Sequence, residues 1–187
     1  MTTSQLQRYS PGVEASVSIR KAQLTDAPSI AKLGANVFTA TFGHSVPPHE
    51  LQAFLNAEYT TSAILKDIED ENKDVVVAMG LEGDILGFAY LTTGSSEPCV
   101  EHVESRVELQ RIYVHPSGQG KGVGRLLSST IDEMAKEKGF ENIWLGVWEE
   151  NTRALKAYEK WGYQQVGHHD FAIGEIVQRD HVLLKSL

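Results

Sequence analysis

The sequence predicts an α/β fold, with one mixed sheet and helices on both of its faces. Segments with strand patterns and segments with helix patterns follow the order β-α-α-α-β-β-β-α-β-α-β-β. The part from Val107 to Val147 has the order strand, helix, strand, which predicts a right-handed parallel crossover. No internal repeat, low-complexity segment or linker divides the 187 residues. We therefore expect one domain over residues 16–187, after a flexible N-terminal tail over residues 1–15.

Composition limits the class of protein. Hydrophobic residues make up 41% and charged residues 22%, as in ordinary soluble globular proteins. No apolar run approaches the roughly 20 residues that a membrane helix needs, and the polar N-terminus has no signal region. The net charge of −8 disfavours nucleic acid and anionic membranes as partners and is compatible with a cationic substrate. Cys99 is the only cysteine, so no internal disulfide can form, and we expect a cytoplasmic location.

The N-terminal half begins with an expected strand, Ser16–Arg20, in which apolar and polar residues alternate. Three helices are expected next, because apolar residues recur at helical spacing behind residues that favour a helix start. The first begins after Thr25 or Asp26, the second covers His49–Glu58, and the third begins at Thr61 or Ser62. Two strands then form an expected hairpin, Val75–Met79 and Ile85–Thr93, and a polar surface loop follows over Gly94–Ser105.

The C-terminal half contains the predicted crossover and ends in two strands. Gly139 and Gly162 are suited to end helices, because glycine readily adopts the left-handed conformation of that position. The expected elements are a strand over 107–114, a helix over 123–138, a strand over 143–148, a helix over 151–161, and strands over 163–171 and 176–184.

A glycine-rich turn joins the first strand of the crossover to its helix. Pro116 ends the strand, and glycines then occupy positions 118, 120, 122 and 124. Glycines allow close backbone approach, and the free N–H groups at a helix start attract phosphate. Lys121 and Arg125 add positive charge. The turn therefore predicts an anion site. The dinucleotide pattern G-x-G-x-x-G and the P-loop pattern both fail on spacing.

A second motif lies in the helix over 151–161. Asn151, Ala154 and Tyr158 fall on one side of this helix. By themselves, they could be an N-cap asparagine and a core tyrosine.

Together, Gln119-Gly120-Lys121-Gly122-Val123-Gly124 and the Asn151–Tyr163 segment resemble the two signatures of the GNAT superfamily of N-acetyltransferases. Three further segments are similar to the polyamine N-acetyltransferases of the PaiA type: Phe38–Gly43, Asn142–Glu149 and Val166–Gly174. This likeness spans most of the chain from about Arg20.

The resemblance implies a mostly antiparallel GNAT-like sheet, acetyl-CoA as cosubstrate, no metal, and transfer of the acetyl group to a primary amine by direct attack. The implied acceptor is a small, cationic molecule such as spermidine or spermine, and a homodimer is an expectation of the family. The implied cofactor-binding residues are Ile112, Tyr113, Val114, Gln119, Gly120, Lys121, Gly122, Val123, Gly124, Arg125, Asn151, Ala154 and Tyr158.

Two residues are catalytic candidates within this resemblance. The Tyr158 hydroxyl would deliver a proton to the leaving CoA thiolate. Glu108, on the strand beside the reaction centre, would act as base through water, although it could also be a strand-surface residue. Glu149, Glu150 and Asp170 could hold distant ammonium groups or be ordinary surface residues.

Alternatives of two classes remain open at this point. One is the same enzyme class acting on a protein, a peptide or another small amine. Some peptide-acetylating relatives carry a glutamate on the strand where this sequence has Gly146, which disfavours a peptide. The other is a non-catalytic CoA-sensing module, which the presence of both Asn151 and Tyr158 disfavours. The histidines show no H-x-x-x-H pair, and His168 and His169 would face opposite sides of a strand, so a metal site is not expected.

Overall fold

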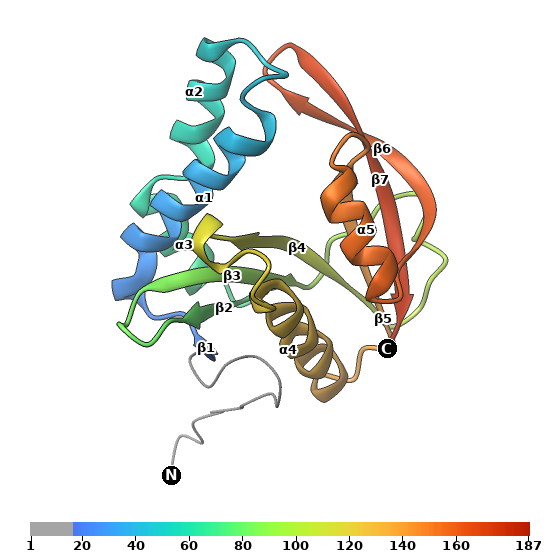
Figure 1. Ribbon diagram of the computed structural model, residues 1–187. Coiled ribbons are helices and arrows are strands. Elements are labelled where there is room, and N and C mark those ends of the chain that lie inside the picture. The colour runs from blue at the N-terminus through green and yellow to red at the C-terminus, as the bar shows by residue number, and fades with distance from the viewer. Residues whose placement is uncertain (1–16) are drawn as a thin grey trace.

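The computed structural model describes residues 17–187, which form a seven-stranded sheet with helices on both faces (Figure 1). The strand order is β1-β2-β3-β4-β5-β7-β6, and of the strands in the described part of the chain only β4 and β5 pair in parallel. The predicted α/β, mostly antiparallel fold is therefore confirmed, whereas the predicted tail over residues 1–15 lies outside the described residues. The strands are β1 (Ser18–Lys21), β2 (Lys73–Met79), β3 (Ile85–Thr92), β4 (Arg106–Val114), β5 (Asn142–Trp148), β6 (Gln164–Ile173) and β7 (Ile176–Ser186). The α-helices are α1 (Ala27–Phe42), α2 (Pro48–Glu58), α3 (Thr61–Glu69), α4 (Val123–Glu137) and α5 (Thr152–Lys160).

Two hydrophobic cores lie on opposite faces of the sheet. Helices α1 to α3 cover one face, where Ile30 and Ile64 pack with Phe88 of β3. Helices α4 and α5 cover the other face, where Leu127 and Tyr158 belong to one buried cluster with strand residues such as Leu145. The helical spacing predicted for α4 is confirmed, because the side chains on its sheet-facing side are all buried: Val123, Leu127, Ile131 and Met134.

The start of α1 differs from the prediction. Asp26 does not cap the helix with its side chain; a 3₁₀ turn over Leu24–Asp26 precedes α1 instead. The Asp26 carboxylate accepts hydrogen bonds from the Arg20 guanidinium at 2.6 and 2.9 Å and from the Gln23 N–H at 2.7 Å. Because charge-assisted bonds to a guanidinium are strong, Asp26 is held by Arg20 rather than by the helix end.

The loop between β3 and β4 is not wholly at the surface, as the polar composition of Gly94–Ser105 had suggested. Val100 is fully buried and packs with Trp144 of β5 and Val182 of β7. Gly167 of β6 makes room for this loop, since a Cβ atom there would lie 2.6 Å from the Cβ of Cys99. The loop therefore covers the part of the sheet that α1 to α3 leave open.

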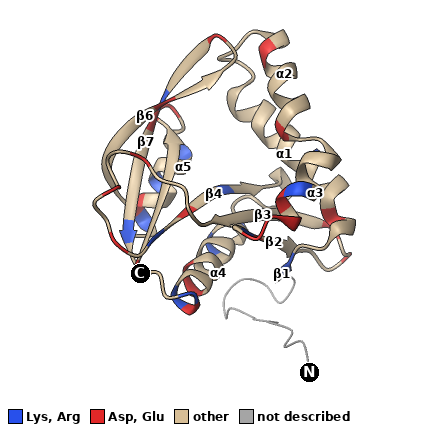
Figure 2. Cartoon of the chain, turned by 180° about the vertical axis from the view of Figure 1, so that it is seen from behind, with Lys and Arg blue, Asp and Glu red and all other residues tan. Residues whose placement is uncertain are grey.

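The long hairpin of β6 and β7 reaches the N-terminal end of α2 (Figure 1). The Glu175 N–H at its tip donates to Glu50 Oε1 of α2 at 3.3 Å. Lys and Arg positions are interspersed with Asp and Glu positions over the helices and outer strands (Figure 2). Within residues 17–187, none of the helices combines the length and the apolar character needed to cross a bilayer.

Candidate active site

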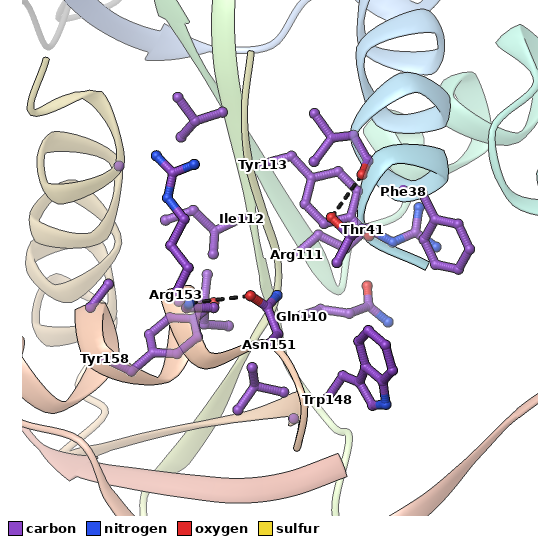
Figure 3. Close-up of a pocket in the computed structure, with 18 of the residues that line it drawn as sticks. Phe38, Thr41, Gln110, Arg111, Ile112, Tyr113, Trp148, Asn151, Arg153 and Tyr158 are labelled. Carbon is purple, nitrogen blue, oxygen red and sulfur yellow. Dashed lines mark hydrogen bonds between the residues drawn. The ribbon is translucent and has the colours of Figure 1, made fainter. Parts of the chain in front are cut away.

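The parallel strands β4 and β5 pair over only three positions and then separate. Their register runs from Arg106 opposite Asn142 to Glu108 opposite Trp144, whereas β4 continues to Val114 and β5 to Trp148. A cavity of about 960 Å³ lies where the strands diverge, lined by residues of both strands, of α1, α4 and α5, and of the β6–β7 hairpin (Figure 3). Its size is that of a typical small-molecule site.

The open edge of β4 supplies backbone donors to this cavity. In an antiparallel pair, successive residues alternate between bonding to the partner strand and pointing away from it. The His115 N–H donates to Leu86 O at 2.8 Å, so the Val114 N–H points away from β3, and so does that of Ile112 two residues earlier. Both residues line the cavity. Tyr113 also lines it, but its hydroxyl pairs with that of Tyr59 at 2.7 Å.

The glycine-rich turn forms the other wall, at the start of α4. Gly120 and Gly122 have φ values of +76° and +81°, which strain any residue with a side chain, and Gly122 is the N-cap of α4. The N–H groups of Val123, Gly124 and Arg125 belong to the first helical turn, where no intrahelical acceptor exists. Free N–H groups at a helix start attract anions. Of the two cationic residues predicted here, Arg125 lines the cavity, whereas Lys121 is exposed and is not among the lining residues.

The side-chain amide of Gln119 uses both of its polar atoms in hydrogen bonds that tie the glycine-rich turn to β4 and α5. Its amide nitrogen donates to Val114 O at 3.1 Å, and its Oε1 accepts from Arg153 Nη1 at 2.5 Å. Arg153 thus brings a cation from α5 to the glycine turn. The sequence prediction did not include Arg153, although it lies two positions after Asn151 in the second motif.

Asn151 and Tyr158 place α5 along the cavity, together with Ala154. Asn151 Oδ1 accepts from the Ala154 N–H at 3.2 Å, which confirms the predicted N-cap and leaves the amide nitrogen of Asn151 for other contacts. Tyr158 is 8% exposed and lies edge-on to the rings of Trp161 and Tyr163. Burial, and then the nearby Tyr113 hydroxyl, raise the pKa of Tyr158 well above its usual value. Its hydroxyl therefore stays protonated and can act as a donor.

Glu108 lies at the point where β4 and β5 part, and it lines the cavity. Burial raises the pKa of its carboxyl group, and the negative charge of Glu97 adds to this, while Ser95, His169 and Lys73 act in the opposite direction.

Aromatic side chains line the cavity on the side of α1 and α2. Phe38 stacks on Phe54 with ring centroids 4.5 Å apart, and Phe54 meets Phe171 of β6 edge-on at 5.9 Å. Phe42 contacts Trp148 of β5 at 5.3 Å. These side chains come from two helices and two strands, and only the fold brings them to one wall of the cavity.

Polar residues of the β6–β7 hairpin also reach the cavity. His169 and Asp180 are opposite each other in the register of the two strands, and both line the cavity. The sequence prediction included neither residue. No group of three or more His, Cys, Asp and Glu side chains within residues 17–187 is arranged to hold a metal ion.

Comparison with known proteins identifies a family. The model of the Acetyltransferase (GNAT) family matches residues 36–163, which is more than half of the chain. An uncharacterized N-acetyltransferase of Mycobacterium tuberculosis (strain ATCC 25618 / H37Rv) is 27% identical over 164 residues, covering 88% of this chain and 99% of that protein. The spermine/spermidine N(1)-acetyltransferase of Bacillus subtilis (strain 168) is 30% identical over 124 residues, covering 66% of this chain and 81% of that protein.

A solved structure shows the same fold. The PaiA N-acetyltransferase from Thermoplasma acidophilum in complex with coenzyme A superimposes with a TM-score of 0.75 over 92% of this chain and 99% of that chain. Its sequence identity is 19%, so this similarity concerns the fold alone.

Proposed function

The chain belongs to the acetyltransferase (GNAT) family and is an N-acetyltransferase, and we propose that it moves the acetyl group of acetyl-CoA to a small polyamine such as spermidine or spermine. The observation that carries the proposal is the junction of β4 and β5. There, an open strand edge and a glycine-rich helix start meet acidic side chains in one cavity.

The donor side of this cavity suits acetyl-CoA. The free N–H groups of Val123, Gly124 and Arg125, with Arg125 and Arg153 nearby, would hold the diphosphate. The open edge at Ile112 and Val114, and the amide nitrogen of Asn151, would hold the amide-containing arm. Bound there, acetyl-CoA supplies an activated acyl group as a thioester.

Residues of this chain then have distinct tasks in the transfer. The Val114 N–H donates to the carbonyl oxygen on which negative charge develops. The Tyr158 hydroxyl, held protonated by its raised pKa, donates to the departing sulfur. Glu108 lies beside the incoming ammonium group, where its negative charge attracts the cation and where it could take a proton through water.

A second hollow supports a substrate with more than one positive charge. This hollow, of about 600 Å³, adjoins the main cavity at Trp148, which lines both. Glu149, Glu150 and Asp170 line it, together with the cation Arg179. A polyamine bound with one nitrogen near Glu108 could extend past Trp148 and place its second nitrogen among these carboxylates.

An amine panel tests the proposal. We expect free thiol release from acetyl-CoA with spermidine and spermine, weaker release with butylamine, and none above background with an alanine-terminated hexapeptide. Turnover of the peptide without turnover of either polyamine would contradict the polyamine assignment and favour a protein or peptide acceptor. A failure of every amine, with acetyl-CoA bound normally in calorimetry, would favour a CoA-sensing module.

The second hollow predicts a selective effect on the KM for polyamines. We expect the double variant Glu150→Gln/Asp170→Asn to raise the KM for spermidine about tenfold, because two exposed charge contacts are lost, each worth about threefold in affinity. The KM for butylamine should not change, since this amine has no second nitrogen. A matched control, Glu82→Gln/Asp84→Asn, removes the same charge from the exposed β2–β3 turn and should leave both values unchanged. If the two double variants change the KM for spermidine equally, the effect is one of general charge and the proposed binding of spermidine in the second hollow is wrong.

A cytoplasmic location, a single domain over residues 16–187 and a homodimer stay predictions. So does the absence of nucleic acid and membrane partners.

A further inference from the structure

Four distant segments of the chain bring ionisable side chains together at the end of the cavity where the amine acceptor is proposed to bind. Glu108 of β4, His169 of β6 and Asp180 of β7 line the cavity, and Glu97 of the β3–β4 loop contacts His169 from outside the lining. His169 Nδ1 lies 3.1 Å from Glu97 Oε1, and His169 Nε2 lies 3.7 Å from Asp180 Oδ2. Both are ion-pair contacts, and the Nδ1 atom makes no hydrogen bond within residues 17–187. The other carboxylate oxygen of Asp180 is buried and has no hydrogen-bond partner within the described part of the chain.

The imidazole of His169 fills the space beside Gly146 of β5. A Cβ atom at Gly146 would lie 3.1 Å from His169 Cε1 and 3.4 Å from His169 Nε2. Glycine at this position therefore lets the ring reach the region where β4 and β5 part. His169 side-chain exposure is 21%, so the ring is held by its neighbours and still faces the cavity. The adjacent His168 is exposed and absent from the cavity lining, as expected from strand alternation.

We propose that His169 accepts the proton that the substrate ammonium must lose, and that Asp180 and Glu97 position its ring for this task. This proposal rests on the proposed N-acetyltransferase function and makes His169 a catalytic residue, with Asp180 and Glu97 as positioning residues. Glu108 then attracts the cation and stabilises the imidazolium that forms.

The proton and bond changes balance without another reactant. The neutral imidazole of His169 takes one proton from the R–NH₃⁺ group, and the freed amine attacks the thioester carbonyl. An N–C bond forms and the C–S bond breaks. The Tyr158 hydroxyl gives its proton to the sulfur and takes one back from the new amide nitrogen. The proton on His169 then passes to solvent through the cavity, so that each acetyl transfer releases one proton.

Basicity favours His169 over Glu108 for this step. For an amine with a pKa of about 10.4, the equilibrium constant for proton transfer to an ordinary imidazole is about 10⁻⁴. For transfer to an ordinary glutamate it is about 10⁻⁶. The Asp180 carboxylate raises the pKa of His169 further, against the opposing effect of burial, and Glu97 and Glu108 add to the increase. Other ionisable groups in this region include Cys99, on the loop beside Gly167, and Lys73 of β2, which acts on Glu108. Tyr113 and Arg111 of β4 also line the cavity, and the charge of Asp180 acts on the Tyr113 hydroxyl.

The pH dependence of kcat/KM tests the proposal, with spermidine as the acceptor or, if spermidine is not acetylated, the panel amine that is. His169 must be neutral to accept a proton, so kcat/KM of the wild type should rise with pH. This rising limb of the pH profile should have an apparent pKa above the ordinary histidine value of about 6.5. We expect His169→Gln to lower kcat/KM by about 10²- to 10⁴-fold and to remove this limb. Asp180→Asn should move the limb to lower pH, because the largest cause of the raised pKa is lost.

Several controls separate this role from a structural one. His168→Gln should keep the wild-type profile, and all variants should keep their melting temperature and acetyl-CoA affinity. Without acetyl-CoA, an NMR titration of the imidazole should show the pKa of His169 above the ordinary histidine value of about 6.5 and lowered by Asp180→Asn. If His169→Gln and His169→Asn retain the limb, or if Glu108→Gln removes it, the proposal is wrong. If no amine is acetylated by the wild type, the proposed function itself has failed and this inference falls with it.

Discussion

Gly122→Asp should abolish measurable acetyl-CoA binding, with an expected loss of affinity of at least about 100-fold, or about 2.7 kcal/mol. Gly122 is the N-cap of α4 and has a φ of +81°, directly before the free N–H groups proposed to hold the diphosphate. An aspartate here places a side chain and a negative charge beside these donors, and its charge repels a phosphate. The positive φ also strains any side chain at this position, so the substitution is expected to lower stability as well. Isothermal titration calorimetry measures the effect.

Gly139→Asp is the matched control, because it lies at the other end of the same helix. Gly139 has a φ of +85°, and a Cβ atom there would meet no other atom within 4 Å. The two variants therefore share the charge and the backbone strain of a side chain at positive φ. We expect Gly139→Asp to lower the melting temperature and to leave acetyl-CoA affinity unchanged. Similar losses of affinity in both variants would mean that the glycine turn does not bind the cofactor.

Tyr158→Phe should lower kcat by about 10²- to 10⁴-fold while acetyl-CoA still binds, because only the proton donor is removed. The ring of Tyr158 would keep its edge-on contacts with Trp161 and Tyr163. Since the pKa of Tyr158 is raised far above its usual value, the hydroxyl stays protonated throughout the working range. A loss of activity towards high pH in the wild type should therefore not come from Tyr158. Stopped-flow detection of free thiol measures the rate.

Tyr163→Phe provides the control for this substitution. Tyr163 is also buried and contacts Tyr158, but it does not line the cavity. Its hydroxyl is buried without a hydrogen-bond partner among residues 17–187, so its removal should leave both stability and turnover close to wild type. Wild-type turnover in Tyr158→Phe would remove Tyr158 as the acid. An equal loss in both variants would indicate a packing effect.

Most elements could be predicted from the sequence because their causes are local. Alternating apolar residues predicted the strands, and the spacing of Val123, Leu127, Ile131 and Met134 predicted the buried side of α4. Gly122 and Asn151 act at helix starts through their own backbone and side chain, and both were predicted in place. The start of α1 was less predictable, because Asp26 pairs with Arg20 of the neighbouring strand.

The cofactor side of the site could be predicted from the sequence, whereas the acceptor side could not. The sequence by itself determined the glycine turn, the Asn151–Tyr158 helix and the family, since each depends on residues close together in the chain. Only the tertiary structure decided which side chains meet at the acceptor end. Strand β7 lies between β5 and β6, so Asp180 stands between Trp148 and His169 in the register. Alternation along a strand places His168 and His169 on opposite faces, but the order of strands in the sheet determines which face holds the cavity.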